Sequence, residues 1–450
     1  MSHRTQAIVI DHGSYSTKAG FSLEYLPSMV IDSNYLVDED GKVSVGREEV
    51  EKHPENEIMT LMDDGNIYNF DNLDHVWKHV YDNVDNGQAV SSKEHPLVVT
   101  EQTWNSASNK AKLAQKAFET FEVPLFSLVK KPQAQLYAMG RSSGLVVDVG
   151  AAVASVTPIL DGTVQTNASF HSKYAGDFVN LQILKFLESC VTLDNLVPKK
   201  FRSCKMSPSF MNYQISYNVL DDFKASMLQI SEVPVSETSS AVPLNSYQLP
   251  NKLHVPIKQE QTTLAEALFE PKTVPLKDIY LPEPSLSDPP TNGISKMILL
   301  ALKNLESAYI TANDATNSAH YNSSYAKFNE VLKELLGNIV ITGGTSLASG
   351  FTQRVLNDIY RLANQFFPNY LATQPGRLII GTLGNYQQND INEVWDKSFD
   401  SWFGACNLAN MLRSGDLEGA ENINVALENW FVTKSDYEEF GEDLILEKFK

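Results

Sequence analysis

The sequence predicts an α/β fold of two duplicated lobes, and three observations support this. Three segments far apart in the chain, residues 7–21, 145–162 and 338–350, each begin with an apolar β-branched run and break at glycine. Strand-like and helix-like patterns alternate between these segments, as they do in α/β proteins. The length of 450 residues exceeds what one hydrophobic core usually holds, so two large lobes are expected.

The first third of the chain is predicted to alternate strands and helices. Residues 7–36 are expected to form a strand, a turn and two further strands, and residues 71–83 have the apolar spacing of a helix. A buried strand is expected at 95–101, a helix at 109–121 and a short strand at 125–129.

The second hairpin, at 145–162, starts the same plan again. Helices are predicted at 177–190, 219–232, 294–308 and near 350–365. The two halves therefore repeat one arrangement, in which a hairpin with an aspartate at a strand end is followed by strands and helices.

Two segments interrupt this plan. Residues 233–291 combine Ser-rich and Pro-rich stretches, which indicates a peripheral subdomain with a flexible edge. Residues 309–326 are polar and rich in Asn, Ser and Ala, so an inserted loop is expected there.

The glycine-bearing segments indicate a nucleotide phosphate clamp made of two facing hairpins and a third loop. Asp11 and Asp148 end strands in the first two segments, and the duplication would place them face to face across a central cleft. A strand-ending aspartate alone is commonly a turn former. That interpretation weakens here because Gly343, Gly344 and Thr345 follow a third buried strand.

The net charge of −19 at pH 7 limits the classes of partner. Binding to DNA phosphates needs a basic face, so direct sequence-specific nucleic-acid binding is not expected as a main activity. A strongly acidic protein suits a basic partner such as a Lys/Arg-rich helix, although the charge also fits solubility alone.

Cysteine usage and hydropathy narrow the class further. Three cysteines, Cys190, Cys204 and Cys406, fit a reducing compartment better than a disulfide framework. The sequence has no Cys or His spacing typical of a metal site. The absence of an apolar run of about 18 residues argues against a transmembrane helix or a membrane partner.

At this level of detail the chain resembles actin over most of its length. The similar blocks occur in actin's order and lie at 7–21, 94–124, 136–150, 247–257 with 264–271, 338–351, 401–410 and 430–441. The resemblance implies the duplicated two-lobe fold with a central nucleotide cleft that actin shares with Hsp70 and hexokinase.

The departures from actin point to an actin-related protein. The segment that carries the filament-forming loop in actin is shortened here to VDEDGKVSVG, and residues 309–326 and 412–429 are foreign to actin. The stretches 146–162, 132–143 and 223–232 resemble most the seventh type of yeast actin-related protein, a subunit of SWI/SNF- and RSC-type chromatin remodelers.

The resemblance implies four subdomains. They are expected at 1–32, 61–138 and 400–450 (subdomain 1), 33–60 (subdomain 2), 139–175 and 292–399 (subdomain 3, with the polar insertion 309–326), and 176–291 (subdomain 4).

It also implies a partly retained nucleotide site. Asp11 and Asp148 match the aspartates that hold the hydration shell of Mg²⁺, and Lys18 matches the lysine that reaches the phosphates. The other matching nucleotide-site positions are Gly13, Ser14, Gly150, Lys224, Gly343, Gly344 and Thr345. These positions favour binding of ATP with Mg²⁺.

Other positions depart from the family's site. Lys131 replaces the glutamine that positions the attacking water; a lysine has no acceptor for that task but could neutralise phosphate charge. Ala151 removes a carboxylate for the ribose, and Ala152 replaces a glycine, which would be unfavourable if the site needs positive φ. Ser155 replaces an assisting histidine, and Ala225 replaces a glutamate beside Lys224.

These departures predict a protein without meaningful ATPase activity, because phosphoryl transfer depends on positioning and electrostatics. No cofactor is required, and binding of ATP without turnover stays open. His12 stands where the family has a smaller residue, and a surface or turn histidine is the favoured interpretation.

The resemblance places a partner groove opposite the nucleotide mouth. Its matching positions are Tyr137, Gly140, Ser142, Gly162, Leu408 and Met411. The expected partners are the basic helicase-SANT-associated helix of a remodeler ATPase subunit, a second actin-related protein and other remodeler subunits. Alternatively, Leu408 and Met411 are core residues of their helix.

The sequence interpretation is therefore a nuclear, non-catalytic scaffold subunit of a chromatin remodeler. Two alternatives are an actin-related subunit of a histone acetyltransferase complex and an active ATPase of the same superfamily. A filament-forming subunit is disfavoured by the shortened segment.

Overall fold

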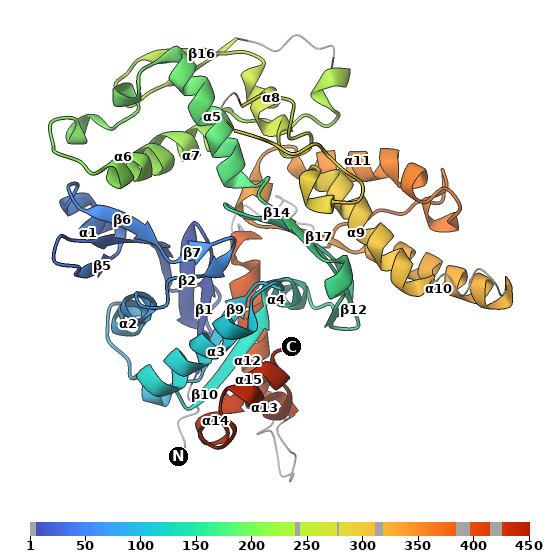
Figure 1. The fold of residues 1–450 in the computed structure, drawn as a ribbon, viewed down its shortest axis with the longest axis horizontal. Helices are drawn as coiled ribbons and strands as arrows, with labels where there is room; N and C mark the ends of the chain where they lie inside the picture. The colour runs from blue at the N-terminus through green and yellow to red at the C-terminus, as the bar shows by residue number, and fades with distance from the viewer. Residues whose placement is uncertain (1–5, 239–243, 277–278, 311–317, 384–396, 415–424) are drawn as a thin grey trace. The chain divides into compact units, whose positions relative to one another are not determined.

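The computed structural model describes residues 6–238, 244–276, 279–310, 318–383, 397–414 and 425–450. The chain divides into two compact units, Met1–Ser142 with Val394–Lys450 (unit 1) and Ser143–Glu393 (unit 2). Both units contain sheets and helices, so the α/β class is confirmed (Figure 1). The finer division into four subdomains stays a prediction.

Unit 1 is built on a six-stranded sheet in the order β18-β10-β9-β1-β2-β3. Its strands are β1 (Ile8–His12), β2 (Ser16–Phe21), β3 (Met29–Asp32), β9 (Leu97–Glu101), β10 (Leu125–Lys130) and β18 (Val432–Thr433). Smaller sheets comprise β4 (Asn34–Val37), β5 (Val43–Val45) and β6 (Glu57–Thr60), and β7 (Met62–Asp63) with β8 (Asn66–Ile67).

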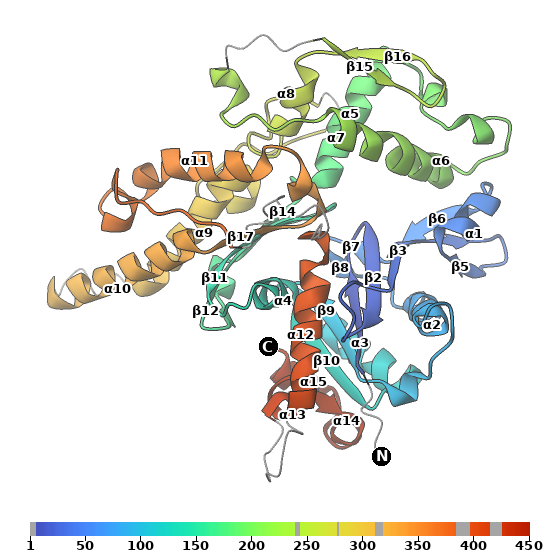
Figure 2. The ribbon, with the colours of Figure 1, turned by 180° about the vertical axis from the view of Figure 1, so that it is seen from behind.

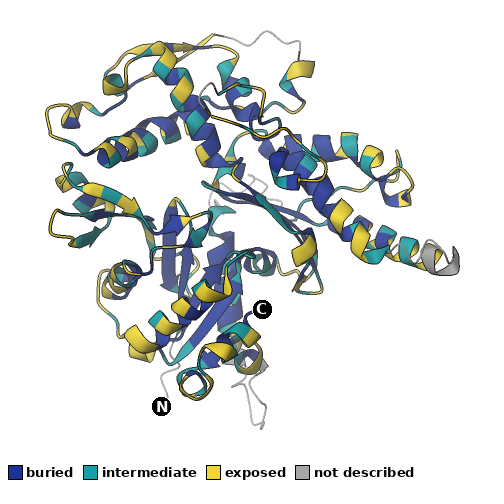
Figure 3. Cartoon of the chain, viewed as in Figure 1, coloured by how far each residue is buried: buried dark blue, intermediate teal, exposed yellow. Residues whose placement is uncertain are grey.

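The central strands of this sheet are buried on both faces. Alternate side chains of a strand point to opposite faces, so Val9 and Val98 join one core cluster with Trp402, whereas Ile10 and Val99 join another. Figures 2 and 3 show the helices around this sheet and its buried strands. The helices are α1 (Arg47–Lys52), α2 (Leu73–Asn83), α3 (Ala107–Gln115), α4 (Lys131–Ala138), α12 (Asp400–Ser414), α13 (Val425–Trp430), α14 (Lys434–Phe440) and α15 (Glu442–Lys448).

Unit 2 has a sheet in the order β13-β12-β11-β17, with β14 paired to β12. The strands are β11 (Gly144–Val149), β12 (Ala154–Leu160), β13 (Thr163–Val164), β14 (Phe170–Ser172) and β17 (Ile339–Thr342), and a separate hairpin comprises β15 (Asn245–Gln248) and β16 (His254–Ile257). The helices are α5 (Gly176–Cys190), α6 (Pro208–Ile215), α7 (Asp221–Met227), α8 (Glu260–Glu266), α9 (Ile294–Tyr309), α10 (Ser318–Gly337) and α11 (Phe351–Phe366).

Two sequence predictions in unit 2 were wrong in part. The helix expected to run to 232 ends at Met227, because the Gln229 and Ile230 amides donate instead to the carbonyls of Gln261 and Ser349, at 3.0 and 2.9 Å. The loop expected at 309–326 is α-helical from Ser318, while 311–317 lie outside the described residues.

The helical start of α10 escaped sequence reasoning because its first turns are polar. The helix is held further along, where Phe328 and Leu332 are fully buried. Tyr325 also stacks on Tyr370, with ring centroids 4.4 Å apart. Tertiary packing of this kind outweighs weak local propensity.

Two further observations concern the cysteines and the helices of the described part of the chain. All three cysteines are free thiols, with Cys406 buried. Among the described helices, none is long and apolar enough to cross a membrane.

Candidate functional site

The first glycine-bearing segment forms the predicted hairpin of β1 and β2. Its antiparallel register places Asp11 opposite Lys18. The turn closes with a hydrogen bond from the Gly13 amide to the Ser16 carbonyl, 3.1 Å long. A Cβ on Gly13 would lie 2.9 Å from that same carbonyl oxygen, so the tight turn requires glycine. Ser14, the next residue of the turn, is half-buried.

The sheet order brings two further groups, Thr100 and Lys131, to this hairpin. β1 runs parallel to β9, and β9 runs parallel to β10. The carboxyl ends of neighbouring parallel strands meet at one edge of a sheet. Asp11, Thr100 and Lys131, which follow or end these strands, therefore gather there, although they are far apart in sequence.

The Asp11 carboxylate is buried and neutralised by lysines. Its Oδ1 accepts a 2.5 Å hydrogen bond from the Thr100 hydroxyl and lies 3.0 Å from the Lys131 ammonium. Lys18 Nζ lies 3.9 Å from Oδ2. Burial alone would raise the pKa of Asp11, but the charges of Lys131 and Lys18, with the Thr100 hydrogen bond, lower it to about 2.

Lys131 is a buried residue at the start of α4, with only 6% of its surface exposed. Besides Asp11, its ammonium donates a 2.5 Å hydrogen bond to the His12 carbonyl. The ammonium has three N–H donors and no acceptor. It therefore offers no acceptor that could orient a water, and its charge is directed at Asp11.

The interpretation of His12 as a surface or turn histidine was wrong. The side chain is 2% exposed, and the Trp77 indole N–H donates to its Nε2 at 2.9 Å. An indole N–H can only donate, so Nε2 is unprotonated and Nδ1 carries the proton. Burial, and next the charge of Lys131, lower the pKa of His12 to about 3, which keeps the ring neutral.

His12 belongs to a directed chain of hydrogen bonds that ends on the turn. Its Nδ1 donates to the Thr17 hydroxyl at 3.1 Å, and that hydroxyl lies 3.2 Å from Ser33 Oγ. Ser33 donates in turn to the Gly13 carbonyl at 2.5 Å. This series of hydrogen bonds stabilises the turn through side chains that the sequence analysis did not connect to it.

The second hairpin, of β11 and β12, is fixed to two other segments of unit 2. The Gly150 carbonyl accepts from the Gly176 amide at 3.1 Å and from the Thr345 hydroxyl at 2.7 Å. The Asp177 amide donates to the Ala151 carbonyl at 2.7 Å. The hairpin, the start of α5 and the loop after β17 therefore contact one another.

Gly343 allows this meeting. Its φ is +87°, and a Cβ there would lie 2.5 Å from the Val149 carbonyl oxygen and closer still to Asp148 Oδ1. Asp148 itself is half-buried and lies beside Thr342 in the parallel register of β11 and β17. Gly344, by contrast, has open space around the position of a Cβ.

The altered positions of the second hairpin cause no backbone strain. Ala151 and Ala152 are half-buried, and neither has positive φ. The backbone strain that alanine would cause at a position with positive φ is therefore not present at Ala152. Ser155 is buried opposite Asp148. Lys224 pairs with Asp221 at 2.8 Å, beside the exposed Ala225.

The first hairpin does not fit the Mg²⁺ ion that the fold family implies. Asp11 is the carboxylate that should face the ion's hydration shell, but Oδ1 already contacts an ammonium and a hydroxyl. The described residues contain no group of three or more His, Cys, Asp or Glu side chains that could hold a metal. The role predicted for Asp148 stays a prediction.

The predicted partner-groove residues divide between the two units, so the groove as a whole stays a prediction. Leu408 is 3% exposed within the core cluster of unit 1, which confirms the alternative interpretation for that residue. Met411, one helical turn later, is 44% exposed. Tyr137 is half-buried against the same cluster. The remaining positions are Gly140 and Gly162, both with positive φ, and the exposed Ser142.

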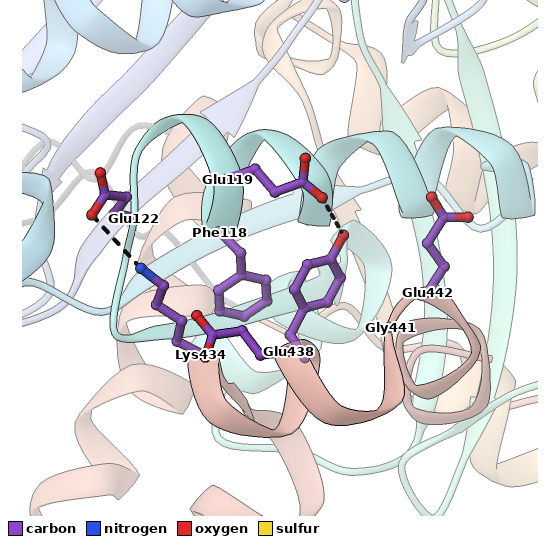
Figure 4. A pocket seen from close by; sticks show the side chains of 8 residues that line it. Phe118, Glu119, Glu122, Lys434, Glu438, Gly441 and Glu442 are labelled. Carbon is purple, nitrogen blue, oxygen red and sulfur yellow. Dashed lines mark hydrogen bonds and ion pairs between the residues drawn. The ribbon is translucent and has the colours of Figure 1, made fainter.

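Sequence reasoning missed an acidic groove in unit 1 (Figure 4). It has a volume of about 550 Å³, and its carboxylates are Glu119, Glu122, Glu438 and Glu442. Phe118 and Tyr437 stack along it with centroids 4.7 Å apart, and Lys434 lies 3.7 Å from Glu122. The SDYEEFGED run at 435–443 was the available signal. Lysine and arginine side chains are the electrostatic complement of this lining.

Comparison with known proteins agrees with these observations. A family model described as "Actin" matches residues 2–450. The chain is 28% identical to "Actin-related protein 7" of Saccharomyces cerevisiae, with 98% of each chain covered. It is 28% identical to "Actin-related protein 4" of Yarrowia lipolytica, covering 85% of this chain and 90% of the relative. It is 25% identical to "SWI/SNF and RSC complexes subunit arp42" of Schizosaccharomyces pombe, covering 98% and 97%.

Proposed function

The chain belongs to the actin family, and we propose that it is a non-catalytic scaffold subunit of an ATP-dependent chromatin-remodeling complex. The name of one full-length relative, a subunit of SWI/SNF and RSC complexes, supports the choice of complex. The Asp11–Lys131 pair carries the argument that the subunit does not hydrolyse ATP. The proposed location is the nucleus, where such complexes act.

Loss of hydrolysis follows from what Lys131 does in place of an acceptor. Hydrolysis of a nucleotide requires a group that orients the attacking water and a cation that neutralises the developing charge on the phosphates. Lys131 offers no acceptor, and its ammonium is held by Asp11 and the His12 carbonyl. Ala151 and Ser155 lack the carboxylate and imidazole that the family's site would provide. The proposed role therefore requires no cofactor.

The proposed partners are a basic helix of the remodeler ATPase subunit, a second actin-related protein and other remodeler subunits. A net charge of −19 supports a basic partner, because complementary charge accelerates encounter and disfavours wrong partners. The acidic groove beside Phe118 and Tyr437 contributes to that charge on unit 1. Met411 is the exposed apolar side chain of the predicted partner surface.

Affinity capture tests this function. We expect the tagged full-length chain, captured from nuclear extract at moderate salt, to bring down a remodeling ATPase in stoichiometric amount, as identified by mass spectrometry. Capture of histone acetyltransferase subunits without a remodeling ATPase would contradict the proposal in favour of the alternative complex. Met411→Asp should reduce the yield of the ATPase. The matched control Met59→Asp, at a methionine 40% exposed elsewhere in unit 1, should not.

A further inference from the structure

We infer that the Lys131 ammonium is a resident cation that takes the place of a divalent metal ion at Asp11. The first hairpin would then be electrically complete without metal. The observation is geometric: Lys131 Nζ lies 3.0 Å from Asp11 Oδ1 and donates to the His12 carbonyl at 2.5 Å. This inference does not depend on which complex the chain joins.

The fold fixes the position of the Lys131 ammonium. Lys131 begins α4 directly after β10, and Pro132 fixes the backbone at the first turn of that helix. Thr100, at the end of the neighbouring strand β9, donates to the same carboxylate oxygen. With 6% of its surface exposed, the lysine side chain is enclosed and does not extend into solvent.

The charges around Asp11 disfavour the binding of a divalent ion there. One carboxylate faces two ammonium groups, from Lys131 at 3.0 Å and Lys18 at 3.9 Å, and His12 is neutral through its bond from Trp77. These side chains sum to one positive charge. A divalent cation brought to the carboxylate would be repelled by both lysines and would have to displace a satisfied ammonium.

The consequence is that unit 1 should fold and persist equally well with and without Mg²⁺. Removing the Lys131 charge should make the stability of unit 1 depend on Mg²⁺. The buried Asp11 carboxylate would lose its nearest cation, which is strongly destabilising, and Mg²⁺ should then become the available replacement. Lys131→Met keeps the length and apolar stem of the side chain and removes only the ammonium.

The test is thermal unfolding of the full chain with millimolar MgCl₂ or with NaCl of matched ionic strength. We expect the same melting temperature for the wild type in both salts. Lys131→Met should melt several degrees lower in NaCl and recover part of the loss selectively in MgCl₂. The matched control Lys18→Met, which removes the more distant lysine, should not gain a comparable response to Mg²⁺. An equal rise in Mg²⁺ for wild type and Lys131→Met, or no response in Lys131→Met, would overturn the inference.

A second measurement decides the matter if Lys131→Met does not fold. Mn²⁺ can be titrated into the wild-type chain and followed by electron paramagnetic resonance, with Asp11→Asn as the companion variant. No saturable Mn²⁺ binding that depends on Asp11 supports the inference. Saturable binding that Asp11→Asn abolishes would refute it.

Discussion

Arg354→Leu should unfold unit 2 or reduce its free energy of unfolding by about 3–5 kcal/mol, the usual effect of removing one partner from a buried ion pair. Arg354, on α11, is 1% exposed. Its guanidinium donates to both Glu266 oxygens, at 2.8 and 2.7 Å, and to Asp358 at 2.9 Å. Leucine would leave the buried Glu266 carboxylate without the Arg354 cation, and Asp358 would keep only its pair with Arg361.

The same guanidinium also anchors the segment after α7. It donates to the Ser231 and Val233 carbonyls, both at 3.2 Å, and lies over the Phe269 ring, 4.5 Å from its centroid. These bonds connect α8, α11 and the segment at 231–233. Loss of Arg354 therefore removes a cross-link between elements as well as an ion pair.

Denaturation in urea followed by circular dichroism measures the effect. Arg361→Leu is the matched control on the same helix, since Arg361 pairs with Glu237 at 2.6 Å and Asp358 at 3.1 Å but is 38% exposed. Solvent screening should limit its effect to about 1 kcal/mol or less. Equal, small losses for the two variants would show that the Arg354 network does not hold unit 2 together.

Gly343→Ala should destabilise unit 2 by about 2–4 kcal/mol, combining strain at positive φ with overpacking against backbone. The added methyl group would lie 2.5 Å from the Val149 carbonyl oxygen. That oxygen belongs to the paired strand β11 and cannot rotate away. Relieving this contact would require β11 and β17 to separate where the β11–β12 hairpin contacts the loop after β17.

Gly344→Ala is the control for that substitution. The neighbouring glycine has no positive φ, and no atom lies within 4 Å of a Cβ there. Its effect should stay within about 0.5 kcal/mol. Guanidinium denaturation of both variants gives the comparison, and an unaltered Gly343→Ala protein would contradict the packing described for the second hairpin.

The sequence predicted the hairpins and their glycine turns because these features are local. Apolar periodicity and glycine breaks located β1, β2, β11 and β12, and the third loop followed from the Gly-Gly-Thr pattern. The register that places Asp11 opposite Lys18 is the direct consequence of a short turn between two strands.

The environment of His12 could not be predicted in that way. Trp77, its hydrogen-bond donor, lies 65 residues further along the chain. The helical periodicity of residues 71–83 predicts that Trp77 is an apolar core residue. It does not predict a partner for the indole N–H. A single sequence does not show which polar atom a buried indole will meet.

The role of Lys131 could be predicted from the sequence only in part. The resemblance to actin, together with the residue type, predicted the loss of a water-positioning acceptor. Its partner depended on the order of β1, β9 and β10 in the sheet, which brings Asp11 and Lys131 together although they are distant in sequence. The sequence therefore indicated what the site lacks, and the contacts of Lys131 show that Asp11 and the His12 carbonyl hold the ammonium.

The most direct test of the central claim is a single-turnover hydrolysis experiment. The purified full chain, in excess over γ-labelled ATP with Mg²⁺, is compared with actin and with a protein-free blank under the same conditions. We predict no phosphate release above the blank, because Lys131 neutralises Asp11 and offers no acceptor to the attacking water. Phosphate release at or above the rate of actin would contradict the account.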